Sequence, residues 1–551
     1  MLARTAGGTS VGARLALPVV IVATAVLAVS LHRQGHTQGD DFALYLRQAR
    51  SIFEGNPAEV IADNRFAVVN SDSGFSPTGY PWVWPLVLSP FVRFWGLDYD
   101  RLKLIEVAAM CVWVALLHGI VRRRVGRPVA LAVAAVFATS FAYLQHTEQL
   151  ITEIPHLASV TLFVWWFDRV RLRGALLTAR IFDLSVLGVL GALSFNVRRE
   201  GLALILATVA IQSFELLRSN PDADDASATR PTDDRRDDVG AHRARHDGGR
   251  RPMERRWRRP SEVVEVTRTH VRSLVTPLAS FVTAVVVFQL LLPTALLPDN
   301  DNSRSNIDDR FGEYPRILAT QLGFGEHPAV GVMILLVAVV GVVIGVRSRP
   351  HLDGMLLAIA VLSALTIGTH FRKVERYWFQ ITPWVVYFVA VALIAAAGAA
   401  LRHRERLVSL VAAAPLAALV VAHCVVLPGH IADVREFDDA GRVLSGPTEP
   451  TVAPVYEAVR ELTPPGATVA FFRARTMTLL TDRRSFQTKD IDRVAIGADY
   501  LAQRRRDTAW QPDIDEAATA GFVEIWSDPT WILWRIPAAG ATPIETQDDA
   551  S

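Results

Sequence analysis

The sequence predicts a polytopic α-helical membrane protein with about eleven transmembrane helices and a C-terminal extracytoplasmic α/β domain. The first observation is composition, because 51% of the 551 residues are hydrophobic. The second is that these residues gather into long apolar runs of roughly 17–24 residues, the length that crosses about 30 Å of hydrocarbon. The third is that the chain after the last run has the composition of a soluble domain. We therefore expect a transmembrane domain over 1–427 and an α/β domain over 428–551.

The apolar runs set the predicted spans. The first run follows Arg4 and Arg14 and has the outline of a signal peptide. Because many spans follow it, we interpret it as a retained first helix. In chain order the expected spans lie at 15–32, 104–121, 128–145, 153–168, 180–197, 201–217, 273–296, 328–346, 352–370, 379–400 and 407–427.

Arginines in the short loops predict the orientation. They follow the second, fourth, eighth and tenth spans, and all four loops lie on one side if the N-terminus is inside. The positive-inside rule makes that side the cytoplasm. Nearly all basic residues are arginine, a bias associated with bacterial genomes rich in G and C. We expect a multi-pass protein of the bacterial inner (plasma) membrane, with the N-terminus cytoplasmic and the C-terminal domain extracytoplasmic.

Residues 218–272 form the longest polar segment between two predicted spans. Residues 219–260 of this segment are charge-dense and nearly devoid of aliphatic residues, so they cannot bury enough apolar surface to fold. We expect a disordered cytoplasmic loop whose arginine-rich end, 250–259, lies on anionic headgroups. Membrane lipids are the predicted partner of this segment, and a nucleic acid is not.

Residues 33–103 form the predicted first extracytoplasmic loop, which should contain interfacial helices. In "DDFALYLRQARSIFEG", apolar residues recur with helical spacing from Phe42 to Phe53, while Arg47, Gln48 and Arg50 take the other face. Such a helix should lie flat at the membrane surface and end at Gly55. The later stretch "GYPWVWPLVLSPFVRFWGL" is apolar but broken by prolines, and we interpret it as a second interfacial element.

The soluble part shows strand and helix patterns in turn. "ATVAFF", "GFVEIWSD" and "PTWILWRIP" are typical of strands, and "PVYEAVREL" is typical of a helix. A small α/β domain on the outer face is the natural interpretation.

Carboxylates at the outer helix ends are the first candidates for chemistry. Asp40 and Asp41 begin the first interfacial helix, where Asp40 fits an N-cap and Asp41 favours the positive helix end. The alternative is that one of them is a general base. Glu153 opens the fourth span, either as a helix-start residue or as part of the site. His146 and His156 do not have the spacing of a zinc motif, so we predict no metal and no cofactor.

Cations occupy other predicted outer ends, against the positive-inside rule. They either snorkel and pair with neighbouring glutamates or form an anion site. Guanidinium groups suit phosphate in particular. The residues are Arg198 and Arg199 in "NVRREGL" and Arg372, Lys373 and Arg376 in "HFRKVERYWFQ".

These motifs, in this order and on this side, resemble the GT-C superfamily of polyprenyl-phosphate-dependent glycosyltransferases. Relatives include protein O-mannosyltransferases and lipid A aminoarabinose transferases. The resemblance covers roughly residues 15–400. It rests on Asp41 with Tyr45 four residues on, "SPTGYPWVWPLVLSPFVRFWG", "TEIP", "RREGL" and "RYWFQITPW".

The resemblance implies an inverting transfer of a sugar from a polyprenyl-phosphate donor to an extracytoplasmic hydroxyl of a cell-wall glycan, lipid or protein. Asp41 would be the general base, with Asp40 as the alternative because the acid is doubled, and Glu153 would assist. The substrate-binding residues it implies are Tyr45, Arg198, Arg199, Arg372, Lys373, Arg376 and Tyr377.

Two other classes of function stay open from the sequence. A secondary transporter or flippase for a lipid-linked or anionic substrate would also place charges among helices. It should show an inverted repeat with broken helices at mid-membrane, and we see no such repeat. A non-catalytic scaffold of the same fold is the other alternative, because a fold does not by itself imply activity.

Overall fold

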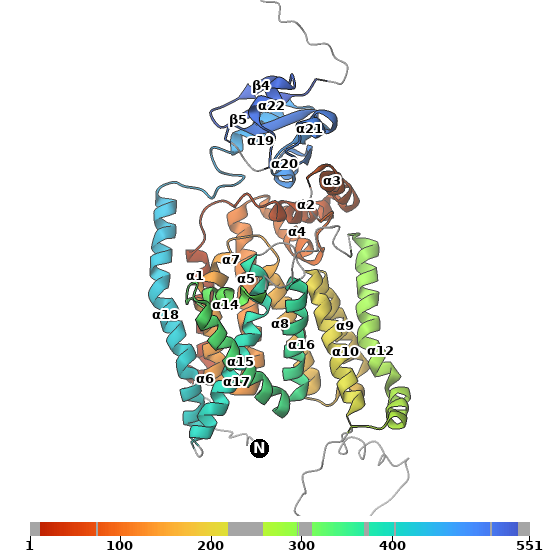
Figure 1. Ribbon diagram of the computed structural model, residues 1–551, viewed down its shortest axis with the longest axis vertical. Helices are drawn as coiled ribbons and strands as arrows, with labels where there is room; N and C mark the ends of the chain where they lie inside the picture. Colours follow the sequence, from red (N-terminus) through yellow and green to blue (C-terminus); the bar gives the residue numbers. More distant parts are fainter. Residues whose placement is uncertain are drawn as a thin grey trace, which may run out of the picture.

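The structure, a computed structural model, is an elongated helical bundle with a smaller α/β domain at one end (Figure 1). It describes residues 11–72, 75, 77–218, 257–294, 296, 311–368, 374–401, 404–506 and 510–537. Most of the predicted cytoplasmic loop at 218–272 lies outside these residues. Its last part does not, because helix α12 begins at Pro260, and the loop therefore ends earlier than the sequence indicates.

Each predicted span overlaps at least one helix in the bundle. Within the described residues, seven helices are long and apolar enough to cross a membrane, and three shorter apolar helices accompany them. The chain is thus a multi-pass helical membrane protein, as predicted. These ten helices are α1 (Val11–Ser30), α5 (Tyr99–Val125), α6 (Arg127–Thr139), α9 (Ile181–Phe195), α10 (Leu202–Leu217), α12 (Pro260–Leu291), α15 (Pro328–Ser348), α16 (Pro350–Gly368), α17 (Thr382–Ala400) and α18 (Glu405–Asp439), and α8 (Glu153–Arg171), at the fourth predicted span, is an eleventh helix of the bundle.

Short helices join the spans. One predicted span, 128–145, is divided at Ser140 into α6 and α7. Helix α18 runs twelve residues beyond the end predicted at 427 and leads into the α/β domain (Figure 1). The connecting elements are α7 (Phe141–His146), η1 (Leu176–Thr178), η2 (Arg199–Gly201), α14 (Tyr314–Gln321) and η4 (Glu375–Gln380).

Three helices of the predicted first outer loop, which keeps that name below, lie between the bundle and the α/β domain: α2 (Asp40–Glu54), α3 (Pro57–Asn70) and α4 (Val83–Trp95). The apolar face of α2 is buried, as its periodicity predicts. Arg47 and Gln48 of its polar face are buried as well, against other parts of the same loop, and Arg50 pairs with Asp482 of the C-terminal domain. Arg47 forms an ion pair with Asp63 of α3 at 3.0 Å, and Gln48 donates to the backbone oxygen of Tyr80 at 2.9 Å. The helix is therefore enclosed by protein on both sides.

The C-terminal domain contains a five-stranded mixed sheet of order β2-β1-β3-β5-β4. Strand β1 pairs in parallel with β2 and β3, while β5 pairs antiparallel with β3 and β4. The three predicted strands and the predicted helix are all present. The elements are α19 (Ala453–Leu462), β1 (Thr468–Ala470), α20 (Ala474–Thr481), β2 (Arg484–Phe486), α21 (Ile491–Gly497), β3 (Tyr500–Arg504), α22 (Ile514–Thr519), β4 (Val523–Ser527) and β5 (Trp531–Arg535).

The opposite end of the bundle gathers the arginines of the predicted cytoplasmic loops. Buried Asp168 of α8 accepts from Arg123 of α5 at 2.9 Å and also pairs with Arg124. Arg173 pairs with Asp183 of α9 at 3.0 Å. These ion pairs tie helix ends together, and they separate this end chemically from the end that carries the α/β domain.

Candidate active site

Asp41 lies where the first outer loop meets the turn before α17. Its Oδ1 accepts a hydrogen bond from the Tyr80 hydroxyl at 2.6 Å, and its Oδ2 lies 3.5 Å from Nη2 of Arg376. The Asp41 side chain is 36% exposed, so it is accessible from outside the protein. The helix carrying Tyr45 and the turn carrying Arg376 therefore share one end of the molecule, as the sequence predicts.

Glu153 lies between two guanidinium groups. Its Oε1 is 2.8 Å from Nε of Arg376 and 3.0 Å from Nη1 of Arg198. Because Arg376 also approaches Asp41, it bridges the two carboxylates. Glu153 raises the pKa of Arg376 above its ordinary value, although burial opposes this effect. The guanidinium thus stays charged at any accessible pH.

The local sequence explains how Arg198 reaches this position. The chain turns sharply after α9 into η2 and α10. A Cβ atom on Gly201 would lie 2.4 Å from the backbone nitrogen of Phe195, so only glycine allows this close return. Arg198 also donates to the Thr152 hydroxyl at 3.3 Å and pairs with Glu200 at 3.0 Å.

Aromatic rings form the surroundings of the charged groups. The guanidinium carbons of Arg198 and Arg376 lie 5.3 and 5.9 Å from the centre of the Tyr377 ring. The Tyr45 ring lies 4.4 Å from that of Tyr80, and its hydroxyl is 3.3 Å from that of Thr152. Tyr45, Arg198, Arg376 and Tyr377 are therefore brought together with Asp41 and Glu153.

The N-cap hypothesis for Asp40 is wrong. Helix α2 begins at Asp40, and its N-cap is Gly39 without a side-chain cap. The Asp40 carboxylate accepts instead from the hydroxyl of Thr476 in the C-terminal domain at 3.4 Å. Burial raises the pKa of Asp40 to about 6, although Arg473 and Arg475 oppose this. The two adjacent acids therefore face different surroundings.

The other residues singled out from the sequence make different contacts or are not described. Arg199 turns back to its own helix end, with its guanidinium 4.5 Å from the Phe195 ring. His146 contacts the backbone oxygen of Ala142 at 2.7 Å, and His156 contacts Gln380 at 3.1 Å. Arg372 and Lys373 fall outside the described residues.

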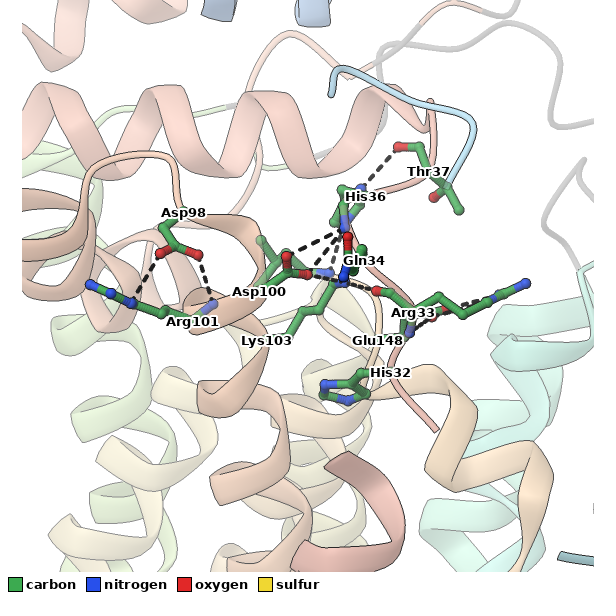
Figure 2. A network of polar contacts seen from close by, with 12 residues as sticks. His32, Arg33, Gln34, His36, Thr37, Asp98, Asp100, Arg101, Lys103 and Glu148 are labelled. Carbon is green, nitrogen blue, oxygen red and sulfur yellow. Dashed lines mark hydrogen bonds and ion pairs between the residues drawn. The ribbon is translucent and has the colours of Figure 1, made fainter. Parts of the chain in front are cut away.

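Glu148, which the sequence places near Glu153, belongs to an anchoring network at the end of α1 (Figure 2). Arg33 Nη2 donates to Glu148 Oε2 at 2.7 Å. Fully buried Lys103 of α5 donates to the backbone oxygen of Arg33 at 2.7 Å and to Asp100 at 2.8 Å. This network fixes α1 to α5 and to the turn before α8. Glu153 is the first residue of α8, so the network also helps to fix its position.

Sequence reasoning missed Tyr80 and Arg475. Tyr80 lies inside a segment that the sequence singles out, but nothing there indicates that its hydroxyl meets Asp41. Arg475 lies in the C-terminal domain, 434 residues from Asp41, and Nη1 approaches Asp41 Oδ1 to 3.8 Å. Among the residues that the structure describes, no three His, Cys, Asp or Glu side chains are grouped so that they could hold a metal ion.

The bundle, the helices of the predicted first outer loop and the C-terminal domain together share their fold with solved membrane-protein structures. ArnT from Cupriavidus metallidurans, in a structure bound to undecaprenyl phosphate, matches with a TM-score of 0.50 at 11% identity, over 97% of this chain and 100% of that one. An oligosaccharyltransferase from Archaeoglobus fulgidus in its apo form matches with a TM-score of 0.51 at 10% identity, over 90% and 70% of the two chains. No protein-family model and no curated protein sequence matches this chain.

Proposed function

We propose that this protein is a membrane glycosyltransferase. It transfers a sugar from a polyprenyl-phosphate donor to a hydroxyl of an extracytoplasmic glycan, lipid or protein. One observation carries the proposal: a partly exposed carboxylate, Asp41, lies 3.5 Å from Arg376 at one end of a GT-C fold. A base next to a fixed cation is what displacement of a phosphate leaving group requires.

Asp41 is the general base in this proposal. It accepts the proton of the acceptor hydroxyl while that oxygen attacks the anomeric carbon. The new C–O bond forms as the bond to the phosphate oxygen breaks, so the configuration inverts. Asp41 gains the proton, and the polyprenyl phosphate departs with the bonding electron pair. Glu153 holds Arg376 and Arg198 in place through the ion pairs described above.

Arg376 and Arg198 stabilise the charge that develops on the phosphate. Guanidinium groups bind phosphate oxygens in a fixed fork geometry, and burial strengthens the interaction. Tyr45 and Tyr377 line the site, and we propose Arg372 and Lys373 as further phosphate contacts, whereas Arg199 points to its own helix end. We also propose that this end faces the outside of the bacterial plasma membrane, where a flipped lipid-linked sugar would arrive from the outer leaflet.

Transfer assays with purified full-length protein in proteoliposomes test the function. The donors are undecaprenyl phosphates carrying radiolabelled mannose, arabinose, glucose or aminoarabinose, and the acceptors are extracted cell-envelope glycans and lipids. We expect covalent incorporation of label. Uptake of label into sealed vesicles without a covalent product would instead establish a transporter.

Binding of undecaprenyl phosphate tests the role of Arg376 separately. We expect the lipid to raise the melting temperature of the wild type, and the Arg376→Gln variant to lose this shift. Arg101→Gln is the matched control, because Arg101 is 64% exposed and pairs with Asp98 of the same outer segment. Equal shifts in all three proteins would contradict a phosphate site at Arg376.

A further inference from the structure

Arg475 of the C-terminal domain is one of the most enclosed charged groups next to the candidate site. It lies on α20, which packs against α2 (Figure 1), and its side chain is 4% exposed. A buried guanidinium is costly unless its donors are satisfied. Its partners therefore indicate why it is there.

The first outer loop supplies these partners. Nε donates to Oδ1 of Asn64 at 2.9 Å, and Nη2 donates to the backbone oxygen of Pro77 at 2.8 Å. Its guanidinium also lies over the rings of Phe75, at 4.6 Å, and Tyr80, at 5.4 Å. These contacts fix both the position and the plane of the guanidinium. Nη1 is then directed at the Tyr80 hydroxyl, 3.3 Å away.

The Tyr80 hydroxyl connects this arginine to Asp41. A guanidinium group can only donate hydrogen bonds, so Tyr80 must accept from Arg475. The single hydroxyl proton is then free to be donated to Oδ1 of Asp41, at 2.6 Å. These two hydrogen bonds, from Arg475 to Tyr80 and from Tyr80 to Asp41, form a relay that holds Oδ1 of Asp41. The other carboxylate oxygen, Oδ2, then faces Arg376.

We propose that Arg475 is a positioning residue for Asp41, and that the C-terminal domain thereby completes the active site. The proposal rests on the proposed function, in which Asp41 is the base. Arg475 acts through Tyr80 and through its own charge. When the C-terminal domain docks on α2, it therefore also orients Asp41.

The pH dependence of transfer distinguishes this role from simple domain attachment. A nearby cation and a hydrogen bond to the charged form both favour an ionised carboxylate. Loss of Arg475 should therefore shift the acid limb of the pH–rate profile to higher pH. The titratable and charged groups that surround Asp41 are Asp40, Tyr45, Tyr80, Glu153, Arg376, Tyr377 and Arg475.

The experiment compares Arg475→Gln with Arg484→Gln in the full-length protein. Arg484 also joins the C-terminal domain to the outer loop, by an ion pair with Asp63 at 2.9 Å, but it is 54% exposed and belongs to another attachment point. For Arg475→Gln we expect the acid limb to move up by about one pH unit and the plateau rate to fall about tenfold. For Arg484→Gln we expect the acid limb of the wild type.

Two further variants keep the test decisive if Arg475→Gln does not fold. Arg475→Lys keeps the positive charge but lacks the several hydrogen-bond donors of the guanidinium group. The acid limb of its pH–rate profile should therefore stay near that of the wild type, while its plateau rate falls. Tyr80→Phe breaks the relay and should shift the limb in the direction expected for Arg475→Gln. Repeating the comparison in the Asp40→Asn background removes the titration of Asp40 itself.

The outcomes separate the two proposals. An acid limb that is unchanged in Arg475→Gln and Tyr80→Phe, or shifted equally in Arg484→Gln, overturns the positioning role while Asp41→Asn remains inactive. Full transfer by Asp41→Asn, or no transfer from any donor, overturns the proposed function instead.

Discussion

Two neighbouring carboxylates on one helix have different surroundings because different elements face them. Asp41 meets Tyr80 and Arg376 and is 36% exposed, whereas Asp40 is buried against Thr476. Replacing Asp41 by Asn should lower the transfer rate by about 10²–10⁴, the usual contribution of a general base. Asp40→Asn should cost less than tenfold. Initial rates at pH 7.5 measure both, with melting temperatures to confirm folding, and equal losses would contradict the assignment.

Asp40 also makes stability depend on pH. Burial raises its pKa from the ordinary 3.8 to about 6, so the folded protein keeps the proton that the unfolded chain loses near pH 4. The stabilisation from protonated Asp40 is complete below about pH 4 and is lost as the pH rises through about 6. At neutral pH the penalty is on the order of 3 kcal/mol. Asp40→Asn should therefore raise the melting temperature more at pH 7.5 than at pH 4.5, and an equal rise at both values would argue against this.

At the scale of elements, small residues set the distance between membrane helices. A Cβ atom on Gly341 of α15 would lie 1.8 Å from the backbone oxygen of Phe388 in α17, so Gly341→Ala must push the two helices apart. We expect a loss of about 1–3 kcal/mol in the free energy of unfolding, as for other overpacked cores. Gly398→Ala in α17 is the control, because nothing lies within 4 Å of its Cβ position. Thermal unfolding in detergent should show a lower melting temperature for Gly341→Ala alone.

The elements that could be predicted are those with a long local signal. Apolar length identified the described helices of the bundle, although it joined α6 and α7 into one span, and apolar runs identified β1, β4 and β5. Strands β2 and β3 were missed, because β2 has three residues and β3 carries Gln503 and Arg504 within five. Most of the polar segment predicted at 218–272 lies outside the described residues, and the start of α12 at Pro260 within it was not predicted.

The candidate site was predictable only where its residues lie at helix ends. Asp41, Glu153, Arg198 and Arg376 follow from charge at the predicted outer ends, and the structure brings them together. Arg475 could not be found in this way, because "RARTMTLL" carries only a helix pattern and its partners lie far away in the sequence. The same long-range contact with α20 explains why the N-cap hypothesis for Asp40 failed.

At the scale of the whole molecule, the two ends of the bundle differ in chemistry. One end holds the carboxylate–guanidinium site and the C-terminal domain, and the other holds the ion pairs of the predicted cytoplasmic loops (Figure 1). Arg349, which follows α15, donates to the backbone oxygen of Arg124 at 3.2 Å, which places the end of α15 among those arginines. The positive-inside rule then predicts which end is cytoplasmic.

Cysteine labelling tests this orientation, on which an outer-leaflet donor depends. Cys111 and Cys424 are first replaced by Ala, and one reporter is then introduced per protein. Ile496→Cys lies in the C-terminal domain at a position 89% exposed, and Ser348→Cys lies at the exposed opposite end of α15. In intact spheroplasts, a membrane-impermeant maleimide should label the first variant, and it should label the second only after lysis. The reverse pattern would place Asp41 and Arg376 on the cytoplasmic side and exclude a donor that has been flipped outward. Labelling of both variants without lysis would contradict the three bundle helices, α16, α17 and α18, that lie along the chain between Ser348 and the C-terminal domain.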